Sequence, residues 1–327
     1  MISHKLRTRT FALAVIASAP ATAALAQTAP PAVYSVGAAY DTDRGRLVVF
    51  GGFMGRYIGD TWEWDGAAWK LVTSTGPIPR NSPALVYDEA RRQIVMFGGD
   101  TRETGALGDT WVYDGTAWRQ VATSGPPART THQLVYDARR QRVVLFGGSA
   151  GEQVFGDTWE WDGQQWTERA TSGPPARTLY GLAYDRERGR TVLFGGTAML
   201  APNAPSFGDT WEWDGTRWAQ LNVTGPSARD HVAMGYDPTR KAAIVHGGGL
   251  GDVDPGETWA FDGRAWTRVT AAGPRRRYAK LAFDPKANAL LLYGGFDRQP
   301  SNTLWKLNGS TWEQIGEAKL FQSQSRR

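Results

Sequence analysis

The sequence predicts an all-β fold, a six-bladed β-propeller of four-stranded antiparallel blades, and two observations point to it. First, an apolar run ends in a Gly-Gly pair six times, at intervals of 47 to 52 residues, with the pairs beginning at Gly51, Gly98, Gly147, Gly195, Gly247 and Gly294. Second, each repeat holds four short segments rich in Val, Leu, Tyr, Phe and Trp, separated by Asp, Gly and Pro, as strands and turns require. Such units bury both faces of every sheet when they are arranged radially around an axis. A linear solenoid is the alternative, but it needs polar capping units, and the terminal units show none.

Every unit has the same order of elements, which the third unit illustrates. Its first strand is predicted over 129–137, its second ends at Gly147, and its third is joined to a fourth at Trp166 by the Asp-Gly of a tight hairpin. Each blade is therefore completed in sequence order, without a strand borrowed from the opposite terminus. Closure by blade packing alone makes the seam between the first and last blades the weakest joint. The propeller is predicted over 27–316, with blades at about 33–75, 80–124, 129–172, 177–223, 229–271 and 276–316.

Residues 1–26 have the three parts of a cleavable signal peptide. Lys5, Arg7 and Arg9 precede an apolar stretch that ends in the small-residue pattern Ala24-Leu25-Ala26. A membrane anchor is the alternative, but about 14 apolar residues fall short of the roughly 20 that span a bilayer. We therefore expect cleavage after Ala26, a periplasmic or secreted protein, and no stable membrane insertion afterwards. Residues 317–327 are expected to form a flexible tail.

Charge and cysteine content exclude several classes of partner and cofactor. The formal net charge is +5, but three basic residues lie in the leader, which leaves 34 Lys and Arg against 32 Asp and Glu. A chain this close to neutral lacks the basic surplus that nucleic-acid binding requires. The absence of cysteine excludes thiolate metal sites, cysteine nucleophiles and thioether-linked cofactors. We predict no cofactor and no metal, because the histidines after the leader do not form a ligand cluster.

The repeated residues resemble those of the Kelch repeat family. An Arg opens the first strand in five units, Gly-Gly ends the second strand and a Trp opens the fourth, across roughly residues 33–315. The chain is similar in this respect to exported bacterial Kelch proteins and to the repeats in the central domain of galactose oxidase. The resemblance implies a propeller but no single activity, because Kelch propellers include sugar oxidases, a sialic-acid epimerase, plant specifier proteins and protein-binding adaptors. The copper site of galactose oxidase needs a Cys-linked Tyr, which this sequence cannot supply.

The tryptophans and most of the repeated acidic residues are interpreted as structural. All fifteen tryptophans occupy three slots of the repeat. A residue needed in every blade is needed by the blade itself, and a buried Trp contributes a large apolar area between sheets. The Asp residues of Tyr-Asp and Gly-Asp-Thr are likewise expected to tie turns and loops, with Glu257 and Asn302 in the variant copies of Gly-Asp-Thr.

Five arginines stand eight residues before the Asp of Tyr-Asp or Phe-Asp: Arg80, Arg129, Arg177, Arg229 and Arg276. Equivalent positions of successive blades form a ring, so these arginines would surround one mouth of the central channel, with a gap at Val33. Their forked donors could bind carboxylates or phosphates there in bidentate fashion. In Kelch adaptors that bind acidic peptides, arginines near this repeat position contact the ligand, and the resemblance implies the same role here. The alternative is that each Arg pairs with the carboxylate of Gly-Asp-Thr and only ties loops together.

The remaining candidate site residues are those that differ between blades, because variable loops carry function. The loops between the first and second strands are short, charged and alike, whereas the loops after Gly-Gly differ in length and chemistry on the face of the arginines. In the inner strands the divergent residues His132, Tyr180, His231 and Lys280 are predicted to complete the polar lining. The two histidines lie five and six residues before their Asp, so their side chains are expected to point to opposite faces.

Two functions fit these features. The first is a binding module, expected to be monomeric, whose Arg-ringed mouth holds an anionic peptide, an anionic glycan or an envelope protein. The second is an enzyme acting on an anionic sugar, similar to the six-bladed Kelch epimerase of sialic acid, with Glu103 or Glu152 as acid or base. No catalytic constellation stands out, so the sequence favours binding. An isolated, buried carboxylate within hydrogen-bond reach of the arginines would favour the enzyme instead.

Overall fold

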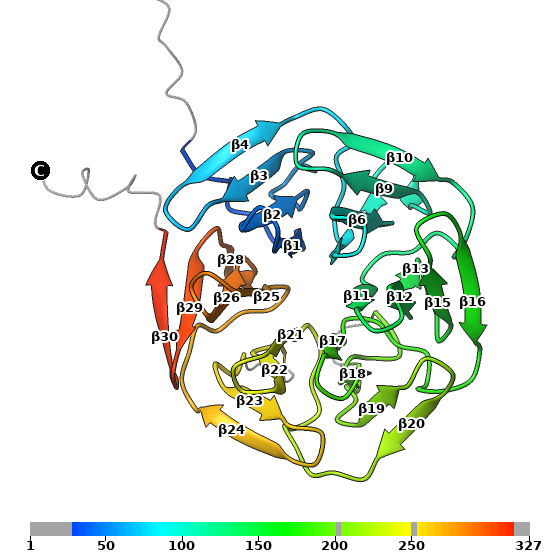
Figure 1. Ribbon diagram of the computed structural model, residues 1–327, viewed down its shortest axis with the longest axis vertical. Helices are drawn as coiled ribbons and strands as arrows, with labels where there is room; N and C mark the ends of the chain where they lie inside the picture. The colour runs from blue at the N-terminus through cyan, green and yellow to red at the C-terminus, as the bar shows by residue number, and fades with distance from the viewer. Residues whose placement is uncertain (1–27, 201–203, 250–253, 317–327) are drawn as a thin grey trace, which may run out of the picture.

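Six four-stranded antiparallel sheets surround a central axis in the computed structural model, which describes residues 28–200, 204–249 and 254–316 (Figure 1). In each sheet the strands follow one another in sequence order from the axis outward. The predicted fold class is therefore confirmed, and so is the completion of each blade in sequence order. The predicted signal peptide and C-terminal tail lie outside the described residues.

Each blade consists of four consecutive long strands. Blade 1 contains β1 (Gly37–Asp41), β2 (Arg46–Phe50), β3 (Thr61–Trp64) and β4 (Trp69–Thr73), and blade 2 contains β5 (Ala84–Asp88), β6 (Gln93–Phe97), β9 (Thr110–Tyr113) and β10 (Trp118–Ala122). Blade 3 contains β11 (Gln133–Asp137), β12 (Arg142–Phe146), β15 (Thr158–Trp161) and β16 (Trp166–Ala170), and blade 4 contains β17 (Gly181–Asp185), β18 (Arg190–Phe194), β19 (Thr210–Trp213) and β20 (Trp218–Leu221). Blade 5 contains β21 (Ala233–Asp237), β22 (Ala242–His246), β23 (Thr258–Phe261) and β24 (Trp266–Thr270), and blade 6 contains β25 (Lys280–Asp284), β26 (Ala289–Tyr293), β29 (Leu304–Asn308) and β30 (Thr311–Ile315).

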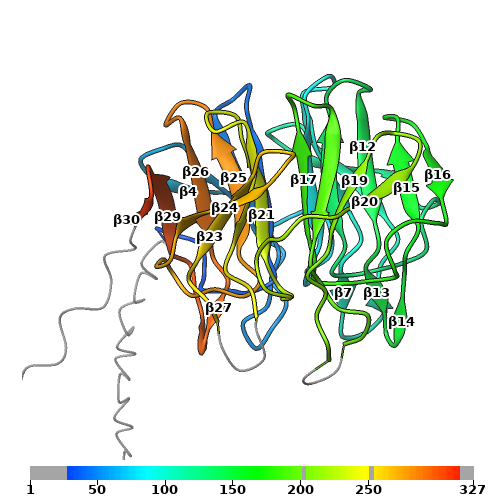
Figure 2. The ribbon, with the colours of Figure 1, turned by 90° about the horizontal axis from the view of Figure 1, so that it is seen from below.

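The loops that follow Gly-Gly project from one face of the disc, which we call the variable face (lower side in Figure 2). Three of them form short hairpins: β7 (Asp100–Thr101) with β8 (Gly105–Ala106), β13 (Ser149–Ala150) with β14 (Gln153–Val154), and β27 (Phe296–Asp297) with β28 (Gln299–Pro300). The loops of blades 4 and 5 include residues 201–203 and 250–253, which lie outside the described residues. The variable face is therefore built from loops that differ in length and form.

The inner strands begin later than the sequence predicted. They were expected to open at the Arg slot, but β11, for example, starts at Gln133, four residues after Arg129. The residue two positions after the slot has a positive φ in every blade, and this left-handed turn separates the arginine from the strand. The six residues are Ser35, Ser82, Thr131, Leu179, His231 and Tyr278, with φ between 48° and 60°.

The tryptophans that open the outer strands join neighbouring blades. Each ring packs on the aromatic residue before Gly-Gly in the preceding blade, as Trp118 does on Phe50 with 5.3 Å between ring centroids. In five of the six, the indole Nε1 also donates a hydrogen bond of 2.8 to 3.0 Å to a threonine of that blade, in the pairs Trp118–Thr61, Trp166–Thr110, Trp218–Thr158, Trp266–Thr210 and Trp312–Thr258. These contacts support the structural interpretation of the repeated tryptophans.

The seam between blades 6 and 1 is built differently from the other five joints. Leu304 stands where the other blades have the threonine, so Trp69 packs into an apolar cluster with Leu304 and Tyr293. Tyr40 Oη donates to Asp284 Oδ1 across the seam at 2.6 Å, and the amide of Asn302 donates to the carbonyl of Pro30 at 2.9 Å. The N-terminal segment thus supplements the joint. That the seam is the weakest joint stays a prediction.

Candidate functional site

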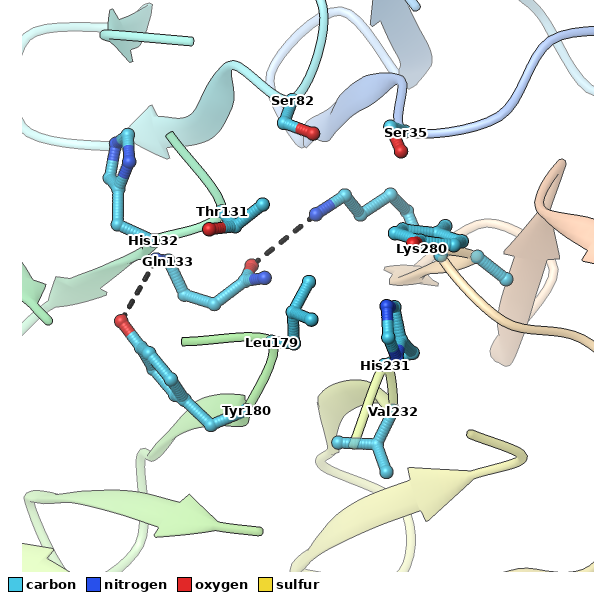
Figure 3. Close-up of a pocket in the computed structure, with 12 residues that line it drawn as sticks. Ser35, Ser82, Thr131, His132, Gln133, Leu179, Tyr180, His231, Val232 and Lys280 are labelled. Carbon is cyan, nitrogen blue, oxygen red and sulfur yellow. Dashed lines mark hydrogen bonds between the residues drawn. The ribbon is translucent and has the colours of Figure 1, made fainter. Parts of the chain in front are cut away.

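A ring of six residues forms the mouth of the central channel on the variable face, and we call it the mouth ring (Figure 3). It consists of the residues with positive φ, one from each blade: Ser35, Ser82, Thr131, Leu179, His231 and Tyr278. Backbone hydrogen bonds join neighbours around it, including His231 N to Leu179 O at 2.7 Å and Ser82 N to Ser35 O at 2.8 Å. The backbone frame is therefore repeated, and only the side chains differ from blade to blade.

Two polar side chains cross the channel beneath the mouth ring. Gln133 and Lys280 open the inner strands of blades 3 and 6, which face each other across the axis (Figure 1). Lys280 Nζ approaches Gln133 Oε1 at 3.5 Å (Figure 3). The same slot holds only small residues in the other blades, namely Gly37, Ala84, Gly181 and Ala233. The pocket between this pair of side chains and the mouth ring has a volume of about 30 Å³, which is room for a water molecule or a small polar group.

Lys280 is a cation without a counter-ion in the described part of the chain. Its Nζ points toward the centre of the pocket (Figure 3), and its hydrogen-bond partner among the described residues is the Gln133 amide. No carboxylate of the described residues forms an ion pair with it. Burial among the six inner strands lowers the pKa of Lys280 to about 8. At neutral pH the side chain of Lys280 is therefore mostly protonated, and no negatively charged group of the described residues balances its charge.

His231 occupies the mouth ring beside Tyr278, with 4.2 Å between the ring centroids. Its Nδ1 pairs with the carboxylate of the preceding residue, Asp230, whose other oxygen accepts a hydrogen bond of 2.9 Å from Ser206. Such a carboxylate fixes the orientation of an imidazole and leaves Nε2 for a ligand. His231 is thus placed to contact anything that enters the mouth.

His132 and Tyr180 each follow a mouth-ring residue in sequence, and their side chains point into the joints between blades. His132 is 1% exposed and stacks edge-on against Phe97, and burial lowers its pKa well below the usual value. Tyr180 is fully buried, and its hydroxyl contacts the carbonyl of Phe146 and accepts a bond of 3.1 Å from the amide of Gln133. Tyr180 thereby fixes the backbone that carries Gln133. The one-residue offset between His132 and His231 does turn their side chains in different directions.

The predicted arginine ring requires a correction, because four of its members do not reach the open mouth. Arg80, Arg129 and Arg177 are 0% exposed and form bidentate pairs of 2.6 to 2.9 Å with Asp109, Asp157 and Asp209. Arg229 is buried in the same way and pairs with Glu257. The left-handed residue that follows turns the strand toward the axis and leaves the guanidinium behind, between the loops. The alternative prediction, in which each arginine ties the carboxylate of Gly-Asp-Thr, describes these four.

Arg276 is the exception, because it has no such carboxylate. The residue that the sequence predicted to pair with it also needs a correction. The sequence assigned Asn302 to the carboxylate slot of blade 6, but the amide of Gly294 donates to Thr303 O as the amide of Gly98 donates to Asp109 O. Thr303 is therefore the counterpart of Asp109. Arg276 Nη2 lies 3.4 Å from Thr303 Oγ1, and its side chain is 13% exposed.

Two larger hollows were not predicted. A funnel of about 450 Å³ opens on the face opposite the variable face, lined by the tyrosines of Tyr-Asp: Tyr40, Tyr87, Tyr136, Tyr184 and Tyr236, with Phe283 in blade 6. Arg186 and Glu89 form an ion pair at its mouth. On the variable face, Phe53, Tyr57, Arg56 and Arg102 line a groove of about 710 Å³ between the loops of blades 1 and 2. Glu103 is an exposed residue of this groove, and Glu152 is exposed on the loop of blade 3.

The described residues lack the side-chain clusters of a metal site and the helices of a membrane span. Within 28–200, 204–249 and 254–316, no three His, Cys, Asp or Glu side chains gather as a metal site. Over the same ranges the structure contains no helix with the length and apolarity needed to cross a membrane.

Comparison with known proteins bears on the fold. No protein-family model matches the chain, and no curated protein does. Among solved structures, the one described as "Structure of YjhT" has a TM-score of 0.68 and 15% sequence identity, and the match covers 88% of this chain and 99% of that chain. At this identity the likeness shows the fold alone. Together with the sheet topology, it shows that the chain is a six-bladed β-propeller.

Proposed function

We propose that the chain is an exported Kelch-type propeller that acts as a binding module and holds the anionic group of a peptide or glycan at the mouth ring. The observation that carries the proposal is the uncompensated ammonium of Lys280 beneath that ring. A partly buried cation without a counter-charge is costly, and such groups concentrate at sites where a ligand supplies the opposite charge.

The surroundings of Lys280 suit a carboxylate or phosphate group. Ser35 and Ser82 offer hydroxyl donors at the mouth, and His231 adds a ring nitrogen. Charge-assisted hydrogen bonds of this kind are stronger than neutral ones. Because the pocket measures about 30 Å³, only the charged head of a ligand enters it. The rest of the ligand would lie on the variable loops, whose diversity then sets specificity.

Replacing Lys280 by Met is expected to abolish the binding of anionic ligands and, at the same time, to stabilise the fold. Titration calorimetry with glucuronate, a sugar phosphate and a tri-glutamate peptide measures the first effect, with glucose and a tri-glutamine peptide as neutral counterparts. The pKa of about 8, against an ordinary value of 10.5, implies a gain of about 2 kcal/mol on removing the buried charge, allowing for partial exposure. Lys286→Met is the matched control, because Lys286 is an exposed lysine of the same blade. Unchanged affinity in Lys280→Met would contradict the proposal.

Ligand affinity is expected to fall as pH rises through 8. The lowered pKa means that the free protein loses the ammonium charge above about pH 8, and each further pH unit then removes up to about tenfold in affinity for an anion. Binding of an anion raises the pKa of Lys280 in the complex, so proton uptake should accompany binding near pH 8. Calorimetry in buffers of different ionisation enthalpy measures that uptake. A constant affinity from pH 7 to 10 would exclude Lys280 as the counter-charge.

An enzyme acting on the bound anion is the second candidate, and the Asp230–His231 pair favours it. An imidazole oriented by a carboxylate is a common general base, and here it adjoins the proposed anion site. The test is to incubate the protein with the ligands that bind and to follow their consumption by NMR. Turnover that disappears in His231→Gln while binding remains would establish catalysis.

A further inference from the structure

In four blades the repeated arginine has a complete set of acceptors. In blade 3, Arg129 Nε donates to the carbonyl of Pro127 at 2.9 Å, Nη1 donates to the carbonyl of Gly147 at 2.9 Å, and Nη1 and Nη2 donate to Asp157 at 2.6 and 2.8 Å. Arg80 and Arg177 repeat this pattern bond for bond. Arg229 keeps the two carbonyl bonds, but it reaches Glu257 through Nη2 alone, which also donates to Ser227 Oγ at 2.7 Å. The fold thus provides one carboxylate for each of these buried guanidinium groups.

In blade 6 the carboxylate is missing. Thr303 takes the position of Asp157, and its Oγ1 is 3.4 Å from Arg276 Nη2. Thr303 keeps the other bond of the slot, since it accepts from Trp305 Nε1 at 3.0 Å as Asp157 accepts from Trp159. The loop geometry is therefore retained while the negative charge is removed.

Arg276 also lacks a second acceptor, the backbone carbonyl that binds Nε of the arginine in blades 2 to 5. The carbonyl of Pro274 corresponds to that of Pro127, but here it contacts Nε2 of His246 at 2.8 Å. His246 replaces the Phe that precedes Gly-Gly in blades 1 to 4. Arg276 Nε is buried without a partner in the described structure. Nη1 donates to the carbonyl of Arg275 at 2.8 Å, whereas Nη2 has only the long contact with Thr303. Two independent substitutions, at Thr303 and His246, thus leave Nε without an acceptor and Nη2 without a carboxylate, which is costly in a largely buried group.

The vacated position is open to solvent. In blades 2 to 5 the carboxylate side chains of this slot are 15% to 19% exposed, although their arginines are at most 1% exposed. In blade 6 the arginine itself becomes 13% exposed. A carboxylate from outside can therefore approach Arg276 from the side on which Asp157 sits in blade 3. Asp297, an exposed residue of β27, forms an ion pair with Nη1 at 3.4 Å, and a carboxylate that binds both terminal nitrogens would displace this weak contact.

We propose that Arg276 forms a second binding site on the variable face, which takes a free carboxylate from a ligand in the place of the missing aspartate. The contacts expected are those that Asp157 makes in blade 3: one oxygen on each terminal nitrogen of the guanidinium, in bidentate geometry. This site is separate from Lys280 and does not depend on the proposed function.

The test uses the full-length chain, with acetate as the probe at constant ionic strength against chloride. Thermal melting and the ¹H–¹⁵N signal of the Arg276 Nε–Hε group are followed during the titration. A saturable rise in melting temperature and a saturable shift of that signal are expected. Both should persist in Lys280→Met and vanish in Arg276→Met. Galacturonate and a glutamate-rich peptide then show whether a sugar or a peptide presents the carboxylate.

Thr303→Asp is the decisive variant, because it restores the internal carboxylate. It should raise the melting temperature in the absence of acetate and weaken acetate binding at least tenfold. Thr303→Asn is the matched control, because asparagine has nearly the size of aspartate and no charge. This variant should bind acetate like the wild type. An equal acetate response in these two variants, or no saturable response in the wild type, would overturn the proposal.

Discussion

Replacing Asp157 by Asn is expected to destabilise the fold by about 3–5 kcal/mol, because it leaves the guanidinium of Arg129 buried without its counter-charge. Arg129 is 0% exposed and uses both terminal nitrogens to bind Asp157. Burial alone would raise the pKa of Asp157, but the hydrogen bonds and charge of Arg129 outweigh it and hold that pKa below its usual value. The pair is therefore strongly coupled in the folded state. The measurement is the free energy of unfolding in urea, supported by the melting temperature.

Asp60→Asn is the control for this substitution. Asp60 stands in the same slot of blade 1, where Val33 replaces the arginine, so removing its charge should change stability by less than about 1 kcal/mol. A similar loss in both variants would mean that the aspartate stabilises the loop without the arginine. A small loss in both would show that the buried pair is replaceable, as some buried ion pairs are.

The fold was predictable because its signals repeat in register. Six Gly-Gly pairs and six outer-strand tryptophans fix the number of blades, and the order of strands in the first and last units fixes how the ring closes. Each signal is local, since it depends on a turn or a strand of a few residues. The slip of one residue between Asn302 and Thr303 occurred where blade 6 lacks the Gly-Asp-Thr pattern. The two-residue spacing from the carboxylate to the tryptophan of the third strand, as in Asp157 and Trp159, already points to Thr303 before Trp305, and the strand pairing agrees.

The direction of the arginines was not predictable from spacing. A single left-handed residue, such as Thr131, separates Arg129 from β11, and its φ of 55° is unusual for a threonine and leaves no mark in the sequence. By contrast, the position of Gln133 opposite Lys280 could have been predicted from the sequence. Both stand four residues after the arginine slot, three repeats apart, and positions three repeats apart oppose each other in a ring of six.

Replacing Gly148 by Ala is expected to be as damaging as the loss of a buried ion pair, at roughly 3 kcal/mol or more. Gly148 has φ of 97°, which residues with a Cβ rarely adopt, and an added Cβ would lie 2.8 Å from the carbonyl oxygen of Thr130 and 2.7 Å from Cβ of His132. Both neighbours belong to the segment that carries the mouth ring. The substitution should therefore displace Thr131 and weaken binding at Lys280 in addition to lowering the melting temperature.

Gly151→Ala separates the two causes. Gly151 lies three residues further along, in the turn between β13 and β14, with φ of 58° and no atom within 4 Å of an added Cβ. Its replacement carries only the cost of a left-handed alanine, about 1 kcal/mol. If both variants lose the same stability, backbone conformation alone explains why glycine is needed. A larger loss in Gly148→Ala, together with weaker anion binding, shows that the second glycine of the pair positions the mouth ring by allowing the two backbones to approach.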